Sequence, residues 1–303
     1  MTGMDEPETT SAPEGTPTQT PTEAAGETYC YVHKKTPTKL SCSRCGNPIC
    51  GRCAIPATVG QHCPDCVAEA RKSAPKVKRQ MPDSPVVMVI IAINVIMFVG
   101  QLYFDDTFTE RLFEVPALVA DGEFYRLFTA MFLHSERQLF HILFNMYILF
   151  SYGPFVEHWL GKVRFIGLYL LAGLMGSAVS YTFGEIGRPS LGASGAIFGV
   201  VGALGVLAFH MRGSAQGIAM LRGVVLFAGI NLLFGFIVPG IDNNAHIGGL
   251  VGGALIAYAL TKNPHQLRPV GVQVATYAGA ALVVAFLVVR RTDDLRTLFP
   301  FLG

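Results

Sequence analysis

The sequence has few charged residues, a single tryptophan and, after Cys66, no cysteine. Only 15% of its 303 residues are charged whereas 51% are hydrophobic, and the mean hydropathy is +0.42. This composition is too apolar for an ordinary soluble domain and indicates a protein with several membrane spans. The formal net charge of +2 is too small to indicate nucleic acid as a partner. Because the first ten residues are polar and acidic and contain no apolar stretch, we expect no cleavable signal peptide.

The composition changes along the chain and predicts five regions. Residues 1–28 are rich in Thr, Pro, Glu and Gly and have little to bury, so we expect a disordered tail. All seven cysteines fall within residues 29–70, which we interpret as one local module rather than as a disulfide framework. A basic linker follows over residues 71–85, and then an apolar domain over 86–290 and a C-terminal tail over 291–303.

The cysteine module contains four pairs of possible metal ligands, and two residues separate the members of each pair. The pairs are Cys30 and His33, Cys42 and Cys45, Cys50 and Cys53, and Cys63 and Cys66. This spacing lets both members of a pair reach one ion from a tight turn, and eight ligands suffice for about two tetrahedral zinc ions. Reduced, unliganded thiols or disulfides are the alternative, but so short a segment has little core without metal.

The spacing leaves the pairing of these ligands open. The pairs can alternate in a cross-brace or fill two sites in sequence, and His62 can replace its neighbour Cys63 as a ligand. The stretch resembles a B-box-like zinc finger, and closed sites of this kind are structural. We therefore expect a docking or regulatory module with a cytosolic protein partner, rather than a catalytic metal.

Seven apolar segments follow, each close to the roughly 20 residues that a helix needs to cross the bilayer. They cover residues 86–104, 139–156, 163–183, 192–210, 219–238, 244–261 and 272–290. The fourth and the sixth are rich in glycine and carry polar residues, so a hydropathy scan underrates them. With the N-terminus inside, eleven Lys and Arg flank the spans on the inner side and seven on the outer side. This asymmetry, and a thiol-rich module suited to a reducing cytosol, predict a cytoplasmic N-terminus and an external C-terminus.

The apolar domain is organised around Gly192-Ala193-Ser194-Gly195, a hydroxyl among small residues at the start of the fourth span. Small residues in membrane helices more often serve close packing than chemistry, so this motif alone is weak evidence for a nucleophile. Two further polar sites change the balance, His246 on the sixth span and the pair His141 and Asn145 on the second. In the predicted topology all of these lie near the outer ends of their spans, and such groups in a bilayer tend to mark function.

Helical spacing suggests how these residues meet. Gly249 and Gly253 follow His246 on one face of the sixth span, and such small residues let its backbone approach a neighbouring helix closely. That approach would bring the imidazole within hydrogen-bond reach of the Ser194 hydroxyl. His141 and Asn145 are four residues apart, hence on one face, and both can donate hydrogen bonds to a developing oxyanion.

Together these three motifs resemble the rhomboid family of intramembrane serine proteases. The resemblance covers residues 86–290 and implies an all-α polytopic bundle of six core helices plus one C-terminal span. It implies that Ser194 is the nucleophile, His246 the base, and His141 and Asn145 part of the oxyanion hole. Gly153-x3-Glu157-x3-Gly161 also resembles a family motif with a structural role.

The sequence departs from the family pattern at two aromatic positions. The Trp-Arg pair of the first outer loop is Tyr125-Arg126 here, and the Tyr that follows the nucleophile by four residues is Phe198. Asp242 precedes His246 by four residues, where we expect it to cap the sixth span rather than to complete a triad. We therefore predict a serine protease with a Ser-His dyad.

The substrates expected for such an enzyme are single-span proteins of the same lipid bilayer, cut near the outer ends of their helices. An inactive rhomboid-like protein that binds and routes membrane proteins is the main alternative. The presence of both Ser194 and His246 speaks against it, because binding needs neither residue. A small-molecule transporter is a third interpretation, but the sequence has no convincing inverted repeat.

Overall fold

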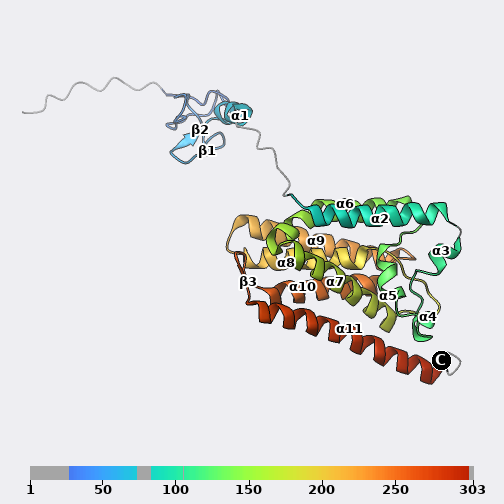
Figure 1. The fold of residues 1–303 in the computed structure, drawn as a ribbon. Helices are drawn as coiled ribbons and strands as arrows, with labels where there is room; N and C mark the ends of the chain where they lie inside the picture. The colour runs from blue at the N-terminus through green and yellow to red at the C-terminus, as the bar shows by residue number, and fades with distance from the viewer. Residues whose placement is uncertain (1–26, 74–82, 105, 300–303) are drawn as a thin grey trace, which may run out of the picture. The chain divides into compact units, whose positions relative to one another are not determined.

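The computed structural model describes residues 27–73, 83–104 and 106–299. Most of the predicted disordered tail and most of the predicted linker lie outside these residues. The chain divides into two compact units, Met1–Arg79 and Gln80–Gly303, and each is described by itself (Figure 1).

The first unit is small and is built around its cysteines. A two-stranded antiparallel sheet, β1 (Ile55–Pro56) and β2 (Gln61–His62), is followed by helix α1 (Pro64–Ser73). Six of the cysteines and Ile49 form the buried interior, so little apolar area is available to stabilise this fold. Helix α1 extends to Ser73, which places the first residues of the predicted basic linker within the helix.

The second unit is a bundle of long apolar helices, as the sequence predicts. The long helices are α2 (Pro85–Tyr103), α6 (Leu139–Leu160), α7 (Lys162–Phe183), α8 (Ser194–His210), α9 (Ala215–Ile237), α10 (Asn243–Leu260) and α11 (Val270–Leu298). Shorter elements lie between α2 and α6, namely α3 (Asp106–Glu110), α4 (Pro116–Ala120), α5 (Arg126–Thr129) and η1 (Ala130–Phe132), and β3 (Thr261–Asn263) and β4 (Gln266–Leu267) precede α11. Each of the seven predicted spans corresponds to one long helix, and the unit is an all-α polytopic bundle.

Hydropathy and length alone identify five of these helices as able to cross a membrane, namely α2, α6, α7, α9 and α11. Helix α8 is apolar but only 17 residues long, and α10 begins with polar residues and contains two pairs of glycines. These are the two spans for which the sequence predicts a weak hydropathy signal. Both lie inside the bundle against α7, whereas only Gly217 and Ala228 of α9 are buried.

Glycines bring α8 and α10 into direct backbone contact. A Cβ atom at Gly249 would overlap the carbonyl oxygen of Gly195, and one at Gly253 would overlap that of Gly199. Because lipid offers no hydrophobic driving force between helices, this close packing of backbones is what holds the pair together. The close approach expected from the sequence is therefore confirmed.

The Glu157 carboxylate fixes the start of α2. Its two oxygens accept hydrogen bonds from the backbone N–H groups of Val86 and Val87, at 3.2 and 2.9 Å. These N–H groups belong to the first turn of α2 and have no acceptor within the helix. Gly153, one turn earlier on α6, makes room for the Val87 side chain. The structural role expected for this motif thus consists in capping one membrane helix from another.

The C-terminal helix lies along one side of the bundle and packs against α7 (Figure 1). The Tyr277 hydroxyl donates to the carbonyl oxygen of Arg164, at 3.0 Å, and Arg296 donates to that of Ala120, at 2.8 Å. These contacts hold α11 near both ends. The contact of Arg296 explains why the helix continues to Leu298, through residues that the sequence predicts as a tail.

Candidate active site

Ser194 and His246 meet at one end of the bundle. Ser194 is the first residue of α8 and His246 lies in the first turn of α10, and the Ser194 hydroxyl lies 2.9 Å from Nε2 of His246. For Nε2 to accept this hydrogen bond, the ring proton must be on Nδ1. That atom is buried and has no hydrogen-bond partner among the described residues. The Ser194 hydroxyl is thus paired with an imidazole, and no carboxylate among the described residues hydrogen-bonds to that ring.

Two neighbours hold the imidazole in place. The Phe198 ring stacks on the His246 ring, with the centroids 4.2 Å apart and the planes within 8° of parallel. Asp242 caps α10, because its Oδ1 accepts a hydrogen bond from the Ala245 N–H at 3.0 Å, which confirms the capping role expected from the sequence. His246 itself is only 8% exposed. The imidazole is therefore stacked on one face, and His246 lies on a helix whose first turn is capped by Asp242.

His141 faces the same site from α6. Its Nδ1 accepts a hydrogen bond from the backbone N–H of Ser135, at 3.2 Å, so the neutral ring carries its proton on Nε2. Nε2 lies beside Gly192, where a Cβ atom would be 2.9 Å from Nε2 and 3.7 Å from the Ser194 hydroxyl oxygen. The backbone amide of Ser135 thus makes Nε2–H of His141 a donor beside Gly192 and Ser194. This amide contact carries no sequence signature.

Asn145 occupies the same face of α6, one turn further on, and is 5% exposed. Its amide donates to the carbonyl oxygen of His141 at 2.9 Å, which uses one of the two amide hydrogens. The structure therefore brings Ser194, His246 and His141 together, while the hydrogen bond of Asn145 runs to its own helix.

A buried layer behind His141 is not evident from the sequence. The His134 ring lies edge-on to the His141 ring, 5.1 Å between centroids, and neither of its nitrogens has a partner among the described residues. Burial lowers the pKa of His134 to about 3, so this ring is neutral. Gln101 of α2 brackets the His134 backbone, accepting from its N–H and donating to its carbonyl oxygen, both at 2.9 Å. The segment that presents the Ser135 N–H to His141 is thereby fixed to α2.

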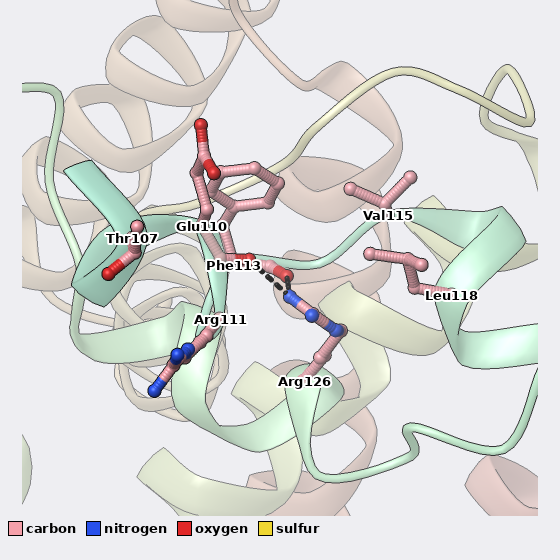
Figure 2. Close-up of a pocket in the computed structure, with 7 residues that line it drawn as sticks. All are labelled: Thr107, Glu110, Arg111, Phe113, Val115, Leu118 and Arg126. Atoms are coloured by element: carbon pink, nitrogen blue, oxygen red, sulfur yellow. Dashed lines mark hydrogen bonds between the residues drawn. The ribbon is translucent and has the colours of Figure 1, made fainter.

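The loop before α6 is anchored by Arg126. Its guanidinium donates to the carbonyl oxygens of Glu110 and Phe113, at 2.7 and 2.8 Å (Figure 2). It also forms an ion pair with Glu123. Hydrogen bonds from Tyr125 and Arg126 lower the pKa of Glu123. An open cavity of about 490 Å³ lies beside the guanidinium, and it contains neither Ser194 nor His246. The replacement of Trp by Tyr125 therefore leaves the arginine anchor intact.

The metal ligands predicted in the first unit form two groups from alternate pairs. The first cluster consists of Cys30, His33, Cys50 and Cys53, and the second cluster of Cys42, Cys45, Cys63 and Cys66. Within each cluster the ligand atoms all lie within 4.8 Å of one another, and no cysteine among the described residues forms a disulfide. His62, on β2, belongs to neither cluster. Both clusters can hold a metal ion, and the pairing is that of a cross-brace.

The distances within the clusters fit a tetrahedral ion. His33 Nδ1 lies 3.3 Å from the Cys50 sulfur and 3.2 Å from that of Cys53, and the sulfurs of Cys45 and Cys63 are 3.6 Å apart. Ligands bound to one zinc at about 2.0–2.3 Å lie roughly 3.5 Å from each other.

Comparison with known proteins finds relatives of the membrane unit. Residues 121–263 match the family model for the Rhomboid domain. The chain is 41% identical over 177 residues to Rhomboid protease GluP of Bacillus subtilis (strain 168), which is 57% of this chain and 34% of that protein. It is 34% identical over 140 residues to YdcA of the same organism, whose name also refers to rhomboid proteases, covering 46% of this chain and 69% of that protein.

An inactive relative is also similar. Inactive RHOMBOID-like protein 8 of Arabidopsis thaliana is 36% identical over 153 residues, which is 50% of this chain and 42% of that protein. The chain thus spans a third to a half of the length of several of these relatives.

Proposed function

The chain belongs to the rhomboid family, and from this membership we propose that it is an intramembrane serine endopeptidase acting through a Ser194–His246 dyad. The observation that carries the proposal is the 2.9 Å approach of the Ser194 hydroxyl to Nε2 of His246, between two helices whose backbones are in contact. Both residues lie at the beginnings of their helices, where a peptide entering from that end of the bundle can reach them.

The proposed reaction is acyl transfer to serine. Nε2 of His246 takes the Ser194 proton as the oxygen attacks the peptide carbonyl carbon, and the resulting imidazolium gives that proton to the leaving amine. Water then cleaves the acyl-serine ester by the same route. Close to the attacking oxygen, Nε2–H of His141 is aimed to stabilise the negative oxygen of the intermediate.

Two further donors complete the proposed oxyanion site. The Ser194 backbone N–H is at the start of α8 and so has no acceptor within the helix. Asn145 contributes through its second amide hydrogen, after a small rotation toward the site.

The proposed substrates are single-span membrane proteins whose helices unwind easily near the cut, because a stable helix hides its peptide bonds. The distribution of Lys and Arg supports a cytoplasmic N-terminus and an external C-terminus in the cell membrane. The dyad then lies toward the outer face, and cleavage releases the external part of a substrate.

The test uses the full chain, purified and reconstituted in liposomes with a fluorescently labelled single-span substrate. We expect Ser194→Ala and His246→Ala each to abolish cleavage, and the double variant to be no worse, since the two residues act as one unit. His210→Ala, a histidine at the other end of α8, is the matched control and should keep its activity. Substrate binding without cleavage by the wild-type chain would instead favour the inactive, binding type of rhomboid-like protein.

For the first unit we propose two structural zinc ions, one in each cluster, in a B-box-like zinc finger spanning residues 29–70. The cross-brace pairing, the free thiols and the scarcity of other buried side chains support this. We propose that the module binds a cytosolic protein and takes no part in the chemistry, which belongs to residues 86–290.

A further inference from the structure

One hydrogen bond links the segments that lead into the two dyad helices. Ser190 lies four residues before Ser194, and Asp242 lies four residues before His246. The Ser190 hydroxyl donates to Oδ2 of Asp242 at 2.6 Å. The bond thus joins two residues that lie at the same sequence distance before Ser194 and before His246.

Asp242 uses both carboxylate oxygens. While Oδ1 caps α10 through the Ala245 N–H, Oδ2 also accepts a hydrogen bond from the Ser180 hydroxyl of α7. The Asp242 carbonyl oxygen in turn accepts from the His246 N–H at 3.2 Å. The carboxylate therefore connects the start of α10 to α7 and to the loop before α8.

Ser190 is held from its other side by Glu114. Their backbones form an antiparallel bridge, with N–H to carbonyl distances of 2.8 and 3.0 Å in the two directions. The Glu114 side chain is 1% exposed, and burial together with the neighbouring charge of Asp242 raises its pKa well above the usual range. The backbone bridge to Glu114 therefore fixes the backbone of Ser190, while the Ser190 hydroxyl bonds to Asp242.

The position of Ser194 depends on this loop. Ser194 is the first residue of α8, so its own N–H makes no helical hydrogen bond, and the preceding Gly192 has φ +138°. The contacts between α8 and α10 set the distance between the helices, but they do not fix how the first residue is turned. The hydrogen bond from Ser190 to Asp242, one turn earlier, can do so.

We infer that Asp242 is a positioning residue that, through Ser190, orients the Ser194 hydroxyl toward His246, an inference that rests on the proposed protease function. Asp242 touches neither substrate nor reacting atoms in this role. Its effect should therefore appear in turnover rather than in substrate binding.

The test measures kcat and KM of the full chain in liposomes, together with the rate at which a fluorophosphonate probe labels Ser194. Because small misplacements of reacting groups are expensive, we expect Ser190→Ala and Asp242→Ala each to lower kcat and labelling by about 10-fold to 100-fold, with KM changed less than about twofold. The double variant should be no worse than Asp242→Ala, because both single changes remove the same bond.

Two variants separate positioning from general stabilisation. Ser180→Ala removes the other hydroxyl from the same oxygen and should stay within about threefold of wild-type kcat, since Ser180 does not lead into α8. Asp242→Asn keeps an acceptor for the helix cap and an amide that can bond the Ser190 hydroxyl, so it should recover most of the turnover lost in Asp242→Ala.

Wild-type turnover in Ser190→Ala, or equal losses in Ser180→Ala and Ser190→Ala, would overturn the positioning role while leaving the protease assignment intact. Ser190→Ala decides the question even where Asp242→Ala does not fold. If the wild-type chain neither cuts substrate nor reacts with the probe, the proposed function fails and this inference with it.

Discussion

Gly192 is the position at which a single methyl group should disable the site. Its φ of +138° belongs to a region that residues with a Cβ rarely adopt, and forcing alanine there costs about 1–3 kcal/mol. The added Cβ would also lie 2.9 Å from Nε2 and 3.1 Å from Cε1 of His141. Such atoms need roughly 3.5 Å, so His141 or the Gly192 backbone must move by about half an ångström or more.

This displacement would move Nε2–H of His141, the proposed oxyanion donor beside Ser194. Loss of one oxyanion donor commonly lowers turnover by about 10²–10³. We therefore expect Gly192→Ala to lower kcat by that order with little change in KM, because an oxyanion donor acts in the transition state rather than in substrate binding. The fold should survive, because only the loop before α8 carries the strain.

The assay is cleavage of a labelled single-span substrate in liposomes, with thermal unfolding measured in parallel. Gly187→Ala is the matched control, since this glycine lies in the same loop, has no positive φ and has no atom within 4 Å of an added Cβ. Equal turnover in Gly192→Ala and Gly187→Ala would refute the reasoning, and so would a loss of turnover that follows global unfolding.

The remaining predictions test separate parts of the molecule. His141→Ala and Asn145→Ala should each lower kcat by roughly 10-fold to 10³-fold with smaller effects on KM, and unchanged turnover in both would make them helix contacts only. Glu157→Ala leaves two backbone N–H groups of α2 without an acceptor and should lower the free energy of unfolding in detergent by about 1–3 kcal/mol, with a smaller loss in Glu157→Gln. The wild-type chain should contain about two zinc ions by metal analysis, and a strong chelator should unfold the first unit without stopping cleavage. In Cys50→Ser loaded with Co²⁺, the remaining site should have the absorption spectrum of four thiolates, as in the second cluster, whereas sequential pairing would leave three thiolates and an imidazole.

Local pattern was enough to predict the helices and the contact between Ser194 and His246. Seven apolar runs correspond to seven long helices, and the glycines after His246 predict the close approach that brings it to Ser194. The end of α11 differs from the prediction because charged residues after Arg290 break the apolar run but not the helix. Contacts near α4 and α7 support that last stretch, and hydropathy carries no information about them.

The missed contacts share a physical cause. Ser135 acts through its backbone N–H, which every residue except proline possesses, and Gln101 acts on the backbone of His134. Neither contact selects a residue type that a motif could reveal. The link between Ser190 and Asp242 joins positions 52 residues apart, and only the packing of α7, α8 and α10 makes them neighbours. For Asn145, helical spacing predicted the face correctly but not that its amide would bond its own helix.

The pairing of the possible metal ligands was open for a related reason, since both arrangements satisfy the same spacing. The cross-brace has a consequence for how the first unit assembles. The loop closed by the first cluster runs from Cys30 to Cys53 and contains Cys42 and Cys45, while the loop closed by the second runs to Cys66 and contains Cys50. The two loops overlap in sequence. An ion bound in one cluster therefore shortens the flexible chain that must close around the other ion. Metal uptake should therefore be cooperative. During synthesis both loops can close once Cys66 has left the ribosome, before the first membrane helix, which begins at Pro85, emerges.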